Sequence, residues 1–267
     1  MSLYKAIKRP FGLTYYYVKD EVLPVWRQAL LRADARREVN RSSRHRLPGV
    51  TLAELIGART FSGELIMDQM CMPPHAFQDA TMNDHDDIRP LLAVAQAMQP
   101  RTVVELGTAH GSTVANLCKF CPEAHVWTVN APAEEMTGSI TTFELTKQSI
   151  GWVYREHGYA PRVTQIFENT LELEMGAHLG EARIDLGIID ACHDTEFVMN
   201  DFAKLRPWMS ERGVIVFHDT HPSMRKHLFG SYRACVRLRE QGWDIRHLRE
   251  TWWGVWTKNW DALPLAR

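Results

Sequence analysis

Residues 101–120, RTVVELGTAHGSTVANLCKF, predict a strand, a tight turn and a helix in direct succession. Its first part, 101–107, is a short apolar run of the kind found in strands buried on both faces of a sheet. Its last part, 112–120, has the apolar spacing of a helix. Between them, Gly107 and Gly111 permit a tight turn and a close approach of the backbone to a ligand. Because the helix that follows has free N–H groups at its start, the turn is a candidate binding site for a carboxylate or phosphate.

The same alternation of strand and helix continues to the end of the chain. Further strands are expected at 125–130, 162–167, 184–190 and 213–219, with helices at 87–98, 142–158, 195–208 and 222–241. Such alternation requires crossover connections and therefore a parallel sheet with helices on both faces. The final strands, 243–250 and 251–258, have almost nothing between them, so they must form an antiparallel hairpin. The predicted fold class is α/β: a doubly wound, mostly parallel seven-stranded sheet with a C-terminal antiparallel hairpin.

The chain before this region has no regular pattern of its own. We expect residues 1–87 to form a helical and irregular N-terminal extension, a lid or a dimer contact, beside a main domain at 88–267. Helical periodicity occurs at 21–38, among arginines. A short helix is expected at 51–58, capped by Thr51 with a glutamate three residues later. The extension is expected to contribute no strand, so the main domain should be separable from it.

Composition and charge exclude several classes of protein. The 267 residues are 45% hydrophobic and 24% charged, as in a soluble globular chain, and no apolar stretch is long enough for a transmembrane helix. The net charge of −1 argues against sequence-independent binding of nucleic acid. The five cysteines are scattered, and the N-terminus lacks the pattern of a secretory signal, which together predict a reducing, cytoplasmic location. Cys118 and Cys121 are expected to be buried thiols, because no second pair completes a zinc site.

Polar side chains follow the ends of the predicted parallel strands. In an open parallel sheet, ligands bind at the carboxyl ends of the strands. The acids, amides and histidines that the strands deliver to that edge are Glu105, Asn130, Asn169, Asp190, His193, His218, Asp219 and His221. Two carboxylates and several histidines at one edge indicate proton transfer or a metal ion.

Five segments of the chain resemble one family of enzymes. VVELGTAHGST is similar to the first motif of class I S-adenosylmethionine-dependent methyltransferases. IDLGIIDACHDTEFVMNDF, followed by LRPWMSERGVIVFHDT, resembles the small-molecule O-methyltransferase branch, and WDIRHLRE with WWGVWTK resembles the family's hairpin. The resemblance covers residues 88–258. It implies a Rossmann-like methyltransferase fold and transfer of a methyl group to a hydroxyl of a small molecule, with sugars and natural products as acceptor classes.

The resemblance also implies roles for individual residues toward S-adenosyl-L-methionine. Glu105 would hold the methionine amino end, and the loop that lines the sugar and methionine moieties would comprise Gly107, Thr108, Ala109 and Gly111. Asn130 and Asn169 stand where acids normally meet the ribose hydroxyls and the adenine amine, so both depart from the family pattern. Asp190 matches the acid beside the transferred methyl group. A valine at position 107 is expected to abolish binding by filling the space of the ligand.

Catalysis by such a protein requires an acceptor that is aligned and deprotonated. His193 is the first candidate for the base and His221 the second, with Asp190 as the third catalytic residue. Asp190, Asp219 and His218 form a candidate site for a divalent metal such as Mg²⁺. N-methylation of a small amine and a cofactor-binding scaffold without catalysis remain as alternatives. The partners expected are a small-molecule acceptor and a second copy in a homo-oligomer, with no nucleic acid.

Overall fold

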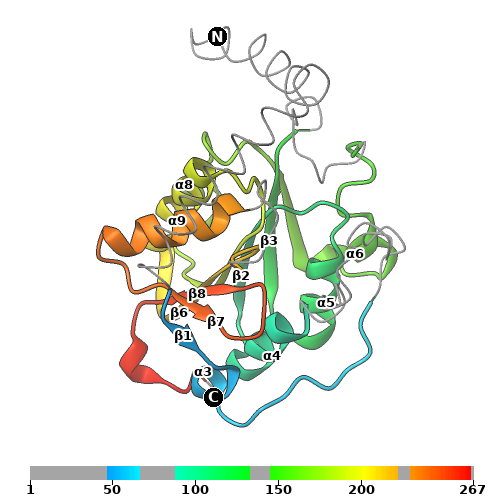
Figure 1. Cartoon of the computed structure of the whole chain (residues 1–267). Coiled ribbons are helices and arrows are strands. Elements are labelled where there is room, and N and C mark those ends of the chain that lie inside the picture. Colours follow the sequence, from blue (N-terminus) through cyan, green and yellow to red (C-terminus); the bar gives the residue numbers. More distant parts are fainter. Residues whose placement is uncertain (1–46, 67–87, 133–144, 222–228, 266–267) are drawn as a thin grey trace, which may run out of the picture.

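The computed structural model describes residues 47–66, 88–132, 145–221 and 229–265 (Figure 1). Eight strands form one sheet in the order β1-β7-β8-β6-β5-β2-β3-β4. The strands are β1 (Gly49–Val50), β2 (Thr102–Leu106), β3 (His125–Asn130), β4 (Val163–Phe167), β5 (Ile184–Ile189), β6 (Met209–Phe217), β7 (Arg246–Leu248) and β8 (Gly254–Thr257). All neighbouring strands are parallel except where β8 lies between β6 and β7, antiparallel to both. The predicted mostly parallel sheet and its C-terminal hairpin are confirmed.

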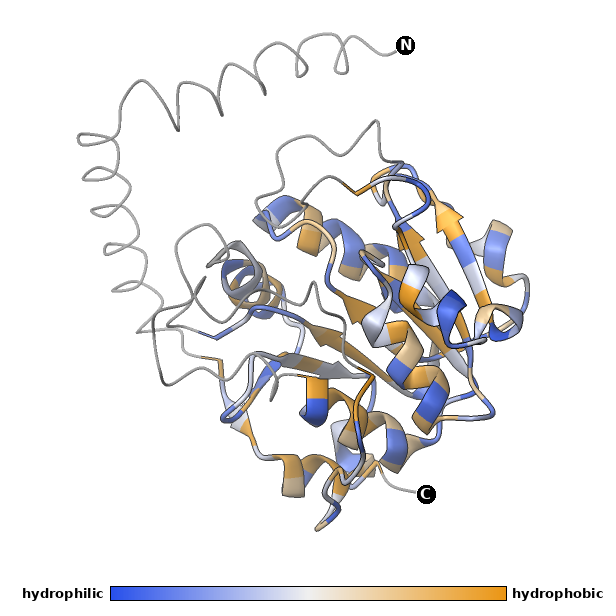
Figure 2. Ribbon diagram, turned by 90° about the vertical axis from the view of Figure 1, so that its right-hand side faces the viewer, coloured by the Kyte–Doolittle hydropathy of each residue, from blue (hydrophilic) through white to orange (hydrophobic). Residues whose placement is uncertain are grey.

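Helices cover both faces of the sheet. One face carries α3 (Leu52–Ile56), α4 (Ile88–Met98), α5 (Ser112–Phe120) and α6 (Trp152–Glu156). The other carries α7 (Met175–Leu179), α8 (Thr195–Leu205) and α9 (Phe229–Glu240), and Figure 1 shows α8 and α9 side by side, away from α4 and α5. Because side chains alternate along a strand, Val103 of β2 enters the first core and Val104 the second. Apolar residues accordingly dominate the strands between the two helical layers (Figure 2).

The sheet has one strand more than the seven predicted. Gly49–Val50 pairs in parallel with β7, so the expectation that residues 1–87 contribute no strand is wrong. The helix that follows is also part of the core, since Leu55 and Ile56 are fully buried. A two-residue strand is too short to produce an alternating pattern, which is why the sequence did not reveal it. The capping box is confirmed: Glu54 N donates to Thr51 Oγ1 at 3.1 Å, and Thr51 N donates to Glu54 Oε2 at 2.7 Å.

The prediction of a long helix at 142–158 is wrong for residues 145–158, the part of it that the structure describes. Residues 145–146 have no regular structure, 147–151 form turns, and the helix is confined to Trp152–Glu156. Gly151 adopts a left-handed conformation with φ of 71°, and its N–H donates to the carbonyl of Ala109 at 2.8 Å. The chain therefore bends here to contact the glycine turn instead of continuing a helix. The helix expected at 21–38 lies outside the described residues.

Two further elements differ from the prediction only at their ends. Strand β6 begins four residues earlier than expected and stops at Phe217, so His218 and Asp219 follow the strand. The described part of α9 begins at Phe229, and 222–228 lie outside the described residues. Within the described part of the chain, no helix combines the length and apolarity needed to cross a membrane.

Candidate functional site

The glycine turn after β2 packs directly on the end of β5. Gly107 has φ of 109°, and a Cβ atom there would lie 2.1 Å from the backbone oxygen of Asp190. A valine at position 107 would therefore clash with the backbone of Asp190 even without a ligand. This clash, and not only the filling of the ligand's space, is why we expect Gly107→Val to be damaging. Ala109 is also left-handed, with φ of 44°, and its N–H donates to Asn130 Oδ1 at 3.0 Å. The end of β5 and the side chain from β3 thus fix the shape of the turn.

Glu105 lies beneath this turn and is almost completely buried, with 1% of its surface exposed. The pKa of Glu105 is raised to about 8, mainly by burial. The charge of Asp190 also raises this pKa, whereas the hydrogen bond from the hydroxyl of Thr128, 2.6 Å from Oε2, lowers it. A carboxyl group with this pKa is largely protonated at neutral pH in the free protein. It can lose that proton when a positive charge arrives beside it.

The two amides that depart from the family pattern each accept a backbone N–H. Asn130 Oδ1 accepts from Ala109 N, and its Nδ2 donates to the carbonyl of Ala131 at 2.9 Å. Asn169 Oδ1 accepts from Leu171 N at 3.1 Å, which closes the turn after β4. Asn130 therefore supports the glycine turn from the neighbouring strand. A carboxylate could accept the same N–H, but it could not also donate to the carbonyl of Ala131.

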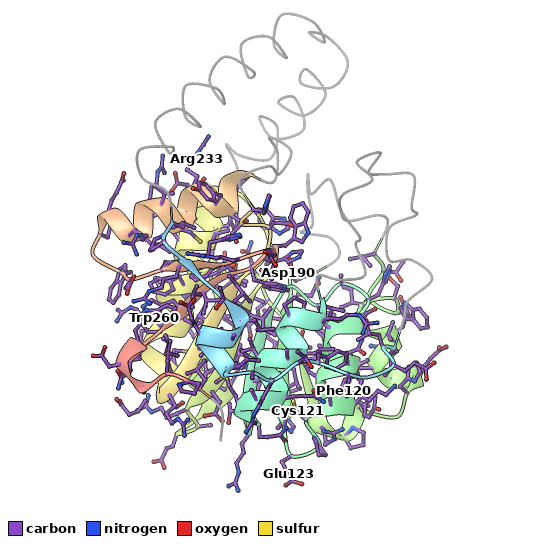
Figure 3. All side chains as sticks on the ribbon, turned by 60° about the horizontal axis from the view of Figure 1, so that its bottom comes forward. Phe120, Cys121, Glu123, Asp190, Arg233 and Trp260 are labelled. Carbon is purple, nitrogen blue, oxygen red and sulfur yellow. The ribbon has the colours of Figure 1, made fainter. Side chains whose placement is uncertain are left out.

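Two acids and two histidines meet at the carboxyl ends of β5 and β6. His193 Nε2 lies 3.3 Å from Asp190 Oδ1 and 3.1 Å from Asp219 Oδ2. His218 Nδ1 lies 2.8 Å from Asp190 Oδ1 and 3.5 Å from Asp219 Oδ1. We call these four residues the Asp–His cluster. Figure 3 places Asp190 between the part of the molecule that carries α9 and the part that carries α5.

The histidines determine the electrostatics of the Asp–His cluster. Burial raises the pKa of Asp190, but the adjoining His218 and His193 lower it more, so the pKa lies well below its usual value. Asp190 therefore remains a carboxylate through the neutral range. Asp219 is buried and left-handed, with φ of 58°, a conformation that costs a non-glycine residue energy and is concentrated at functional sites.

Neighbouring elements hold the histidines in place. The ring of His218 packs on Trp253 of the hairpin with 4.6 Å between ring centroids. The carbonyl of His193 would lie 2.1 Å from a Cβ atom on Gly230, so the start of α9 approaches the His193 loop as closely as only glycine allows. Thr195 Oγ1 also donates to the carbonyl of Gly230 at 3.2 Å. The hairpin and α9 thus form the walls of the Asp–His cluster.

The donor atoms of this cluster suit a divalent cation. Asp190, His193 and His218 each offer one ligand atom, and these atoms lie within 4.8 Å of one another. Two imidazoles with carboxylates favour a transition metal or zinc, whereas Mg²⁺ prefers oxygen ligands alone. The metal set named from the sequence was Asp190, Asp219 and His218, and the structure places His193 beside all three.

His221, the second candidate base, lies in a different environment. Its ring packs against His247 at 5.8 Å and Trp252 at 5.5 Å between centroids. Burial lowers the pKa of both histidines, that of His247 to about 4, and the charge of His221 adds to the effect on His247. Cys118 and Cys121 are buried thiols, as predicted, and burial raises their pKa values to about 11 and about 12.

Sequence reasoning missed the polar side chains that lie under the glycine turn. Thr128 and Gln165 occupy inward positions of β3 and β4, and Tyr154 reaches them from α6. The only signal in the sequence was a polar residue inside an otherwise apolar strand. Trp253 is buried in the core and also contacts His218.

Residues 104–220, from the middle of β2 to the end of the Asp–His cluster, match a family model described as a methyltransferase domain. This part of the chain is therefore similar to methyltransferase domains. The matched segment contains the glycine turn and all four residues of the Asp–His cluster.

Individual proteins resemble the chain more distantly. The uncharacterized protein y4gI of Sinorhizobium fredii is 25% identical over 145 residues, which are 54% of this chain and 16% of that protein. The matched segment thus spans only about a sixth of that relative. The O-methyltransferase TomG of Streptomyces achromogenes, solved with S-adenosylmethionine, is 16% identical, with a TM-score of 0.49 and coverage of 72% of this chain and 89% of TomG. An O-methyltransferase family protein of Burkholderia thailandensis is 14% identical, with a TM-score of 0.45 and coverage of 63% and 55%.

Proposed function

We propose that this chain is a methyltransferase that transfers a methyl group from S-adenosylmethionine to a hydroxyl of a small molecule, with sugars and natural products as acceptor classes. The observation that carries the proposal is the double role of Asp190. Its backbone oxygen supports the glycine turn, and its carboxylate belongs to the Asp–His cluster. The cofactor site and the proton-accepting groups are therefore joined through a single residue.

Bound S-adenosylmethionine would supply an electrophilic methyl group on a sulfonium. The remaining task of the protein is to align the acceptor oxygen and remove its proton. Two carboxylates within 3.3 Å of His193 Nε2 favour positive charge at that point. Either a transferred proton or a divalent cation can provide that charge.

These two options give the cluster residues different roles. Without a metal, His193 acts as the general base, and Asp190 and Asp219 stabilise the proton that it takes from the acceptor hydroxyl. With a metal, Asp190, His193 and His218 would hold the ion, which would bind the acceptor oxygen and make its proton more acidic. His193 cannot be both the ligand and the base, so the two routes exclude each other at this residue.

The test begins with calorimetric titration of S-adenosylmethionine and S-adenosylhomocysteine into the full chain. A screen of hydroxylated small molecules then follows the product by mass spectrometry, with and without a chelator. Methylation at oxygen that requires Asp190 supports the proposal, and inhibition by the chelator selects the metal route. Methylation at nitrogen, or binding without any product, would favour the respective alternatives of an amine methyltransferase and a scaffold. Absence of cofactor binding would contradict the proposal.

A further inference from the structure

A row of polar side chains crosses three strands beneath the glycine turn. Glu105 of β2 is the register partner of Thr128 of β3, and Thr128 is the register partner of Gln165 of β4. On one face of a sheet, register partners have adjoining side chains. Thr128 is fully buried and Glu105 almost so, and the mechanism proposed above assigns nothing to Thr128 or Gln165.

Hydrogen bonds join this row to the turn itself. Thr128 Oγ1 donates to Glu105 Oε2 at 2.6 Å, and the hydroxyls of Thr108 and Thr128 lie 2.7 Å apart. Gln165 Nε2 donates to Thr108 Oγ1 at 3.0 Å and to the carbonyl of Thr128 at 3.1 Å. Thr108 is the residue of the turn that contacts two members of the row, Thr128 and Gln165.

The donor and the acceptor of each bond follow from the number of hydrogens that each group carries. A hydroxyl has one hydrogen, and that of Thr128 goes to Glu105, so Thr108 must donate in the bond between the two hydroxyls. Gln165 faces a backbone carbonyl, which only its NH₂ group can satisfy. Every donor along the chain from Gln165 through Thr108 and Thr128 therefore points toward Glu105.

Tyr154 anchors the far end of the chain. Its hydroxyl donates to Gln165 Oε1 at 3.1 Å. Its ring is clamped by two glycines: a Cβ atom on Gly111 would lie 2.8 Å from the ring, and one on Gly151 would lie 2.4 Å from it. The amide of Gln165 thus has both of its polar atoms engaged, and the tyrosine that engages one of them packs on the glycine turn.

We infer that Gln165 is a positioning residue for the cofactor: through Thr108 and Thr128 it aligns the turn with Glu105, so that Glu105 meets the amino end of the methionine moiety. The inference rests on the proposed function. Gln165 touches neither the cofactor nor the acceptor and acts only through these hydroxyls. Its loss should therefore weaken the binding of ligands that carry the methionine end, whereas contacts with the adenosine end should persist.

The experiment compares two ligands on three proteins. S-adenosylhomocysteine carries the methionine end, and 5′-methylthioadenosine lacks it. Gln165→Leu should lower the affinity for S-adenosylhomocysteine roughly tenfold or more, since it removes the half-buried amide that donates to Thr108 and Thr128, and should leave the affinity for methylthioadenosine unchanged. Thr164→Val is the matched control: its hydroxyl lies 2.8 Å from His125 Nε2, so it also links β4 to β3, but from the opposite face.

Each outcome decides the inference. A loss confined to S-adenosylhomocysteine in Gln165→Leu, with Thr164→Val like the wild type, supports it. Equal losses for both ligands, or none, would overturn it and leave the proposed function intact. If the wild type binds neither ligand, both proposals fail. Should Gln165→Leu not fold, Tyr154→Phe removes only the hydroxyl bonded to Gln165 and should produce a smaller loss for the same ligand alone.

Discussion

Glu105→Gln should remove a large part of the pH dependence of folding stability in the ligand-free protein. The folded state holds the proton of Glu105 up to pH of about 8, whereas the ordinary pKa of a glutamate is 4.5. Because the folded pKa is the higher one, the unfolded chain releases this proton first. The stability that protonation contributes is therefore complete below pH 4.5 and is lost as the pH rises toward 8.

The size of this effect follows from the shift itself. One pKa unit corresponds to about 1.4 kcal/mol, so the wild type should lose on the order of 3 kcal/mol between pH 5 and pH 7 through Glu105. Asp201, fully buried in α8, has its pKa raised to about 7, mainly by burial, and should add to the same trend. A glutamine at 105 keeps the shape and the bond from Thr128 but cannot titrate.

The assay is urea denaturation of the wild type, Glu105→Gln and Glu156→Gln at several pH values from 5 to about 8. Glu156 is exposed at the end of α6, so its variant should follow the wild type throughout. Glu105→Gln should lose clearly less stability than the wild type as the pH rises. If its curve runs parallel to the wild type, Glu105 is ionised in the folded protein and the account of its buried carboxyl is wrong.

Three further changes test other parts of the structure. Gly107→Ala should lower the free energy of unfolding by more than about 2 kcal/mol, since the added Cβ meets the backbone of Asp190. Gly180 is also left-handed but has open space around it, so Gly180→Ala should lower the free energy of unfolding less. Equal losses for the two variants in denaturation would contradict the close packing of Gly107 on Asp190. Thr51→Ala should lower the unfolding free energy by about 1 kcal/mol through loss of the capping box, and an unchanged midpoint in the same assay would show that the cap contributes nothing. A chain that starts at residue 85 lacks β1 and α3 and should be less stable or insoluble, whereas wild-type stability would mean that these elements add nothing to the core.

Much of the fold could be predicted because its signals are local. The apolar runs that became β2, β3 and β5 are long enough to show strand character, and the helix after Gly111 begins where the sequence indicates. The crossover rule then fixes a parallel sheet without any knowledge of tertiary contacts. The acids and histidines at the ends of β5 and β6 could likewise be placed at one edge of the sheet.

What could not be predicted depends on contacts between distant segments. The strand at Gly49–Val50 exists because β7 pairs with it, and the bend at Gly151 exists because its N–H reaches the glycine turn. The spacing of apolar residues in the sequence indicates neither the strand nor the bend. The approach of His193 to both Asp190 and Asp219 also depends on α9, whose glycine at 230 permits close packing on the loop that carries the histidine.

The polar row under the glycine turn shows the same limit. Each of Glu105, Thr128 and Gln165 could be seen as a polar residue in an apolar strand, but only the register brings them together. A shift of one residue in either pairing would direct a member of the row to the other face of the sheet.

A crystal structure of the full chain with S-adenosylhomocysteine bound would show directly where methyl transfer takes place. We expect the ligand across the turn from Gly107 to Gly111, with its amino end toward Glu105 and its sulfur facing the carboxylate of Asp190. A ligand bound elsewhere, or one whose sulfur faces away from the Asp–His cluster, would contradict the proposal that methyl transfer occurs there.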